Sequence, residues 1–96
     1  MIERLEAQLP AFDSRLPLLL AVLFGSYARG DYTVASDVDL LLVYRGERDE
    51  RAFSLAKLTL DVLRLEPHVY AEAEYRELKP TLDRMTGEGI VLWSRI

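Results

Sequence analysis

The distribution of apolar residues along the chain predicts strands that alternate with helices. Residues Leu18–Phe24 (LLLAVLF) are apolar without alternation, which predicts a strand covered on both faces, although this pattern alone leaves a buried helix open. Further strands are predicted at 37–43, at Leu65–Ala71 and at 90–93. This order of elements indicates one α/β domain, spanning residues 1–96, in which helices pack on a small sheet.

Apolar residues three and four positions apart predict the helices. The first stripe lies near the N-terminus and consists of Ile2, Leu5, Leu9, Phe12 and Leu16. A second helix is predicted over 49–64, and its inward side consists of Phe53, Ala56, Leu60 and Leu63. Pro10 predicts a kink or two short pieces in the first helix, and Pro80 predicts an interruption between helical segments at 72–79 and 81–86.

A Gly25-Ser26 turn directly follows the first apolar run. Glycine lets the backbone turn sharply and approach a ligand closely, because it has no Cβ. A short helix that opens at Ser26 would present free N–H groups that favour an anion. Arg29 is a candidate for a bidentate phosphate contact. Together, Gly25, Ser26 and Arg29 predict a phosphate-binding turn.

Two aspartates, Asp37 and Asp39, occupy alternate positions of the second apolar run, with ten residues between Ser26 and Asp37. In a strand, both side chains point to the same face. Two carboxylates so close repel each other unless a cation lies between them. Oxygen ligands of this kind suit Mg²⁺ or Mn²⁺ together with substrate phosphates. The pair therefore predicts a metal site that neutralises charge on a transferring phosphoryl group.

The segment 25–43, GSYARGDYTVASDVDLLLV, resembles the DNA polymerase β-like nucleotidyltransferase superfamily, and in particular its small prokaryotic branch, the minimal nucleotidyltransferases (MNT). The motif covers roughly a fifth of the chain. The resemblance implies a palm-like mixed sheet in which the strand before Gly25 neighbours the strand that carries Asp37 and Asp39. It also implies that Gly25 and Ser26 bind nucleotide phosphate, that the two aspartates bind metal, and that ATP is the donor.

The resemblance further implies a third acidic residue on a later strand, which completes the metal site and acts on the attacking hydroxyl. Glu66 is our candidate for this role. His68 lies two positions on and shares the face of Glu66 in a regular strand, where it would offer a neutral ligand or a general base. Pro67 cannot donate to a sheet ladder, which predicts an edge strand or a strand start.

Composition narrows the class of partner. The formal net charge is −4, whereas a surface that binds duplex nucleic acid or tRNA normally carries a basic excess. Cysteine is absent, which excludes a disulfide framework and a thiolate metal site. No apolar run is long enough to cross a bilayer, and the N-terminus lacks a signal-peptide pattern. These features predict a cytoplasmic protein that does not enter a membrane.

Two functions from different classes fit these features. The first is a metal-dependent nucleotidyltransferase in which Asp37, Asp39 and Glu66 support attack of an acceptor hydroxyl on the α-phosphorus of ATP. About 25 residues follow the predicted strand that carries Glu66, so we expect a partner subunit or self-association to complete the acceptor site. The resemblance suggests a HEPN-domain toxin as the partner, with this chain as the antitoxin that transfers AMP to it. The second function is a non-catalytic nucleotide-binding or partner-neutralising module.

Overall fold

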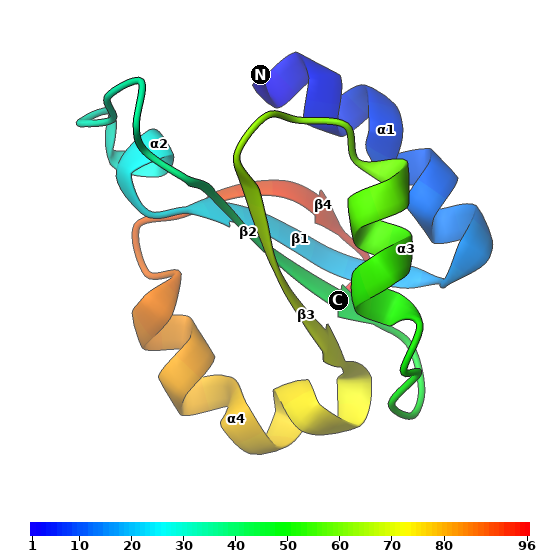
Figure 1. The fold of residues 1–96 in the computed structure, drawn as a ribbon. Coiled ribbons are helices and arrows are strands. Elements are labelled where there is room, and N and C mark those ends of the chain that lie inside the picture. Colours follow the sequence, from blue (N-terminus) through cyan, green and yellow to red (C-terminus); the bar gives the residue numbers. More distant parts are fainter.

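The computed structural model describes residues 1–96 and contains four strands and four helices (Figure 1). In chain order the elements are α1 (Ile2–Arg15), β1 (Leu18–Phe24), α2 (Ser26–Arg29), β2 (Val38–Tyr44), α3 (Ala52–Thr59), β3 (Leu65–Ala71), α4 (Glu72–Met85) and β4 (Ile90–Ser94). The predicted alternation of strands and helices is confirmed, and the runs predicted for the first and third strands match β1 and β3.

The strands form one sheet in the order β3-β2-β1-β4. β1 pairs antiparallel with both β2 and β4, while β2 and β3 run parallel. The sheet is therefore mixed, with the strand before Gly25 beside the strand that carries Asp39, as the resemblance implied. β3 lies at one edge of the sheet, which confirms the edge strand that Pro67 predicted.

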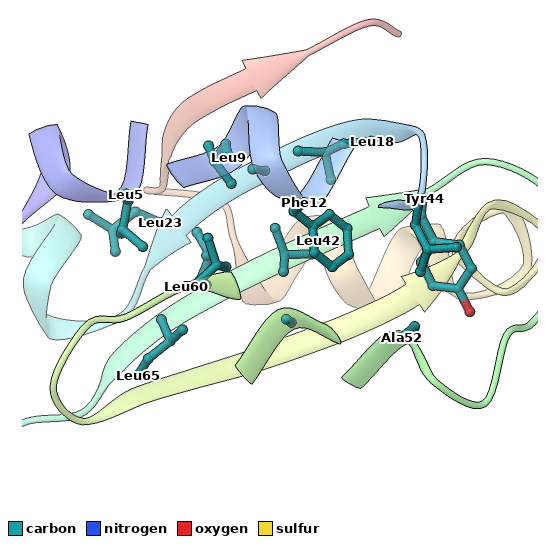
Figure 2. Close-up of a cluster of buried hydrophobic side chains, with 14 of the residues drawn as sticks. Leu5, Leu9, Phe12, Leu18, Leu23, Leu42, Tyr44, Ala52, Leu60 and Leu65 are labelled. Atoms are coloured by element: carbon teal, nitrogen blue, oxygen red, sulfur yellow. The ribbon is translucent and has the colours of Figure 1, made fainter. Parts of the chain in front are cut away.

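Helices cover both faces of the sheet, with α1 and α3 on one face and α4 on the other (Figure 1). The larger core lies under α1 and α3, where side chains of both helices meet alternate residues of the central strands (Figure 2). Phe12 and Leu42 are fully buried there. Burial of an apolar side chain of this size contributes about 1.5–3 kcal/mol, so this face supplies most of the stability. By contrast, α4 buries only Leu82.

Both helices that contain a proline are continuous, which corrects the prediction that these residues would break them. α1 runs through Pro10 and α4 runs through Pro80. Each proline is exposed. The carbonyl that loses its hydrogen bond at each proline therefore lies on the solvent side of the helix, where water can satisfy it.

The third helix is shorter than the predicted span of 49–64. α3 covers only Ala52–Thr59, because the backbone at Leu60 is already extended. Its inward residues are Ala52 and Ala56, whereas Phe53 is 51% exposed and Leu63 is 87% exposed. Leu60 is buried as predicted, but from the connection to β3 rather than from the helix.

Candidate functional site

Gly25 forms a sharp turn between β1 and α2 that only glycine adopts readily. Its backbone has φ 75° and ψ −154°, a region that is essentially restricted to glycine. A Cβ atom placed on Gly25 would lie 2.5 Å from Asp39 Oδ2. The Asp39 carboxylate therefore rests directly against the backbone of the turn, and the pairing of Phe24 with Asp39 explains how they meet.

The predicted short helix is present as α2 and leaves backbone donors free at its start. The N–H groups of Ala28 and Arg29 both donate to the Gly25 carbonyl at 3.1 Å, and that of Gly30 donates to the Ser26 carbonyl at 2.9 Å. The N–H groups of Ser26 and Tyr27 have no backbone acceptor. Free donors of this kind suit an anionic group placed beside the turn.

Asp39, the second residue of β2, is the best-positioned of the predicted metal ligands. Its side chain is 28% exposed, and its Oδ1 lies 3.3 Å from His68 Nε2 on β3. The His68 ring in turn packs against Phe24, with 5.0 Å between ring centroids. One carboxylate oxygen thus faces the Gly25 turn and the other faces His68.

Asp37 lies outside the strand that was predicted to contain it. β2 begins at Val38, whose N–H donates to the Arg64 carbonyl at 2.9 Å and opens the pairing with β3. The Asp37 side chain is 55% exposed and lies 3.3 Å from Arg64 Nη2. The two aspartates are therefore held differently: Asp39 by the sheet, and Asp37 by a loop that Arg64 anchors.

Glu66 and His68 lie beside Asp39, but the structure brings only His68 into contact with it. In the parallel pairing, Glu66 is opposite Asp39 and His68 is opposite Leu41, so all four side chains share one face. Glu66 is exposed. No group of three His, Asp or Glu side chains has the spacing of a complete metal site. Either residue therefore remains a candidate for the third position.

The oxygen donors present fit Mg²⁺ or Mn²⁺. Asp39 Oδ2 lies so close to Gly25 that a methyl group on Gly25 would collide with it. A metal ion held by Asp39 would therefore lie next to the turn that is predicted to bind phosphate. Two exposed carboxylates lie near Asp39. Asp37 is two residues earlier in the chain, and Glu66 is opposite Asp39 in the pairing with β3. Carboxylates together with substrate phosphates are the ligand set that these cations take.

Arg29 lies at the end of α2, where its Nε is 3.4 Å from Asp31 Oδ2. It lines a pocket of about 320 Å³ together with Phe24, Gly25, Arg84 and the turn 87–89. Arg29 therefore lies beside Gly25, and its role as a phosphate contact stays a prediction. This pocket adjoins the turn, whereas a separate pocket of about 410 Å³ is lined by Met1, Arg4, Tyr27 and Arg64 among others.

Arg64 is a site residue that the sequence did not indicate. Its backbone has φ 64°, and it is the only residue other than glycine with a positive φ. Its Nη2 donates to the Ala35 carbonyl at 2.7 Å as well as reaching Asp37. The left-handed backbone at Arg64 costs about 1–2 kcal/mol. The contacts that its side chain makes with the loop before β2 offset part of this cost.

Arg64→Gly is expected to be more stable than Arg64→Ala by about 1 kcal/mol. Both substitutions remove the contacts to Ala35 and Asp37, but only glycine also relieves the positive φ. Chemical denaturation of the two variants measures the difference. Equal stability of the two would show that the backbone at this position carries no strain.

Three charged groups outside the site, Asp49, Arg51 and Lys79, have shifted pKa values. A hydrogen bond from the Arg51 side chain lowers the pKa of Asp49, which follows the opposite end of β2. A hydrogen bond to Asp83 raises the pKa of Lys79 on α4. The Asp49 contribution to stability is therefore present at neutral pH and is lost as the pH falls through its folded pKa, while that of Lys79 is lost only as the pH rises through its own.

Comparisons with known proteins concern the fold and the family of the chain. The nucleotidyltransferase domain family matches residues 5–89. A Methanocaldococcus jannaschii protein named "putative protein adenylyltransferase" is 73% identical over 22 residues, which span 23% of this chain and only 22% of that relative. A nucleotidyltransferase structure from Sulfolobus solfataricus, itself described as putative, superimposes with a TM-score of 0.67 at 26% identity, over 99% of this chain and 81% of that one.

A third similarity is to a chain from the complex of a tri-AMPylated Shewanella oneidensis HEPN toxin with an MNT antitoxin. The TM-score is 0.62 at 22% identity, over 98% of this chain and 73% of that one, which supports the fold. None of the helices of the present chain combines the length and apolar character that a membrane span requires. The family match covers most of the chain and includes the turn, both aspartates and Glu66, so the chain belongs to the nucleotidyltransferase domain family.

Proposed function

We propose that this chain transfers a nucleoside monophosphate, AMP from ATP, to a hydroxyl group on a partner protein, with Mg²⁺ or Mn²⁺ as the metal. The observation that carries the proposal is the contact between the Gly25 turn and the Asp39 carboxylate. This contact supports the proposal, because a carboxylate suits a metal ion and the free N–H groups of the turn suit a phosphate. Most of the rate would come from positioning and charge stabilisation.

In the proposed reaction, the acceptor oxygen attacks the α-phosphorus and forms a new P–O bond. The bond from the α-phosphorus to the oxygen that bridges to the β-phosphate breaks, and pyrophosphate leaves with the electron pair. When bound, the metal would polarise the α-phosphate and neutralise the leaving group. Ser26 and the free N–H groups of the turn would hold the phosphates. Glu66 or His68 would accept the proton of the acceptor hydroxyl.

The proposed acceptor is a HEPN-domain toxin, which this chain would inactivate as its antitoxin. The fold similarity to the Shewanella oneidensis complex supports this proposal, because the toxin in that complex carries AMP. The short identity to a protein named as an adenylyltransferase supports a protein acceptor. A protein acceptor also suits the exposed position of Asp37 and Glu66, which a macromolecule can approach.

Transfer from α-labelled ATP tests the proposal directly. The chain is incubated with Mg²⁺ and a co-expressed HEPN-domain protein, in parallel with γ-labelled ATP. Label on the partner from the α-position alone would demonstrate nucleotidyl transfer. Label from the γ-position would indicate a kinase instead. Absence of label with a folded chain and a verified partner would reject this donor and acceptor pair.

The third catalytic position is tested by Glu66→Gln and His68→Gln in the same assay. Glutamine keeps the approximate size of each side chain but cannot accept the proton. Substitution of the residue that occupies the third position is therefore expected to lower the rate of transfer at least about a hundredfold. We expect the larger loss at Glu66, whose carboxylate can also bind metal. A loss confined to His68→Gln would transfer the role to the histidine that contacts Asp39.

The alternative function is a module that binds its partner without catalysis. The lack of a complete three-residue cluster of metal ligands favours it. Its test is the neutralising effect of the Asp37→Asn/Asp39→Asn double variant on the partner in cells. A binding module would keep its full effect, whereas an enzyme would lose it.

A further inference from the structure

The pocket beside Gly25 is built from parts of the chain that are far apart in the sequence. The turn after β1 contributes Gly25, α2 contributes Arg29, and the last turn of α4 contributes Arg84. Gly87 and Gly89 complete the wall in the turn that leads to β4. Gly25 therefore belongs both to this pocket and to the contact with Asp39.

The turn after α4 is tightly fixed to the end of β1. A Cβ atom on Gly89 would lie 2.5 Å from Val22 Cγ1 and 2.9 Å from the Leu23 carbonyl oxygen. The Gly89 N–H also donates to the Thr86 carbonyl at 2.8 Å. This packing holds the last turn of α4, and Arg84 with it, next to the Gly25 turn.

Arg84 differs from the other basic residues of α4 in having no carboxylate partner. Arg76 pairs with Glu72 and Lys79 pairs with Asp83, each at 2.8 Å. The hydrogen bond of Arg84 is to Thr81 Oγ1 at 3.5 Å, the limit for such a contact. Arg29 is likewise loosely held, at 3.4 Å from Asp31. Two guanidinium groups therefore face one pocket with most of their donors available.

We infer that Arg84, together with Arg29, binds the terminal phosphates of the nucleoside triphosphate in this pocket. The inference rests on the proposed function, which places the α-phosphate beside Asp39. Since Gly25 borders both sites, a triphosphate that starts at Asp39 extends past the turn into the pocket. Two arginines match the charge and the acceptor oxygens of the β- and γ-phosphates. The same contacts would hold pyrophosphate as it leaves.

Glu88 lines the same pocket and carries the opposite charge. It is exposed, so its side chain can turn toward solvent when an anion binds. Its charge nevertheless opposes a phosphate at this position. The pocket therefore gives two substitutions with opposite expected effects on the same ligand, one at Arg84 and one at Glu88.

Isothermal titration of the full chain with ATP, AMP and inorganic tripolyphosphate, each with Mg²⁺, tests the inference. Arg84→Ala is expected to weaken ATP and tripolyphosphate binding about tenfold or more and to leave AMP binding unchanged. Glu88→Gln is expected to strengthen ATP binding. Arg76→Ala is the matched control, because it removes the same charge from the same helix at a position outside the pocket.

The outcomes separate this inference from the proposed function. If the wild-type chain binds ATP no more tightly than AMP, no site for terminal phosphates exists and both proposals lose their basis. If it prefers ATP and Arg84→Ala behaves like Arg76→Ala, the inference is overturned while the proposed function stands. A loss specific to Arg84→Ala, in a variant whose circular dichroism matches wild type, supports the inference. Equal loss for ATP and AMP would show a general effect on the fold and would overturn it.

Discussion

Replacement of Asp37 and Asp39 together by asparagine is expected to lower nucleotidyl transfer by about a thousandfold or more. Asparagine has nearly the shape of aspartate but no negative charge, so the metal would be lost and its charge stabilisation with it. Metal ions contribute several kcal/mol to such transition states, and each 1.36 kcal/mol corresponds to a factor of ten. The measurement is the rate of label transfer from α-labelled ATP under saturating nucleotide.

The fold of the double variant is expected to be intact. Neither carboxylate belongs to the buried core, because Asp37 is exposed and Asp39 is half-buried at the end of the sheet. The free energy of unfolding should change by no more than about 0.5 kcal/mol. Glu47→Gln is the control, since it removes an exposed charge from the loop after β2, outside the site. Full transfer by the double variant would rule out a metal site at these residues.

Gly25→Ala is expected to abolish transfer and to destabilise the chain. Backbone strain in this region costs about 1–3 kcal/mol for a residue with a Cβ atom. In addition, the new methyl group would collide with Asp39 Oδ2 and push the carboxylate away from the turn. Stability is measured by chemical denaturation, and transfer is measured in the assay described above.

Gly46→Ala separates the two effects. Gly46 has φ 93°, but a Cβ atom there would meet no atom within 4 Å. This variant should therefore lose stability of the same order and keep its transfer rate. If Gly25→Ala and Gly46→Ala kept equal activity, the contact between the turn and Asp39 would have no role in the chemistry.

The parts of the site that could be predicted from sequence are those set by local backbone geometry. The uninterrupted run before Gly25 predicted β1 correctly, because seven apolar residues have few alternatives to a buried strand. The turn predicted at Gly25 is confirmed, and its backbone conformation is one that glycine adopts readily. Pro67 likewise indicated an edge strand, since a central strand would need its missing N–H.

The remaining features depend on contacts between distant residues. The start of β2 is set by the bond from Val38 to the Arg64 carbonyl, so no local pattern could show that Asp37 falls outside the strand. Apolar periodicity continued past the true end of α3, which made Leu63 look buried. Arg84 reaches the Gly25 pocket only because Gly89 packs against β1. The spacing of residues in the sequence does not indicate these contacts.

The attachment of α4 by the single buried residue Leu82 has a consequence for dynamics. A helix with so little buried surface can detach at a smaller free energy than global unfolding, whereas α1, with Leu5, Leu9 and Phe12 buried, cannot. Detachment would carry Arg84 away from the Gly25 turn. A ligand that bridges the two segments would favour the closed state, so occupancy of the pocket and hydrogen-exchange protection of the α4 amides are thermodynamically linked.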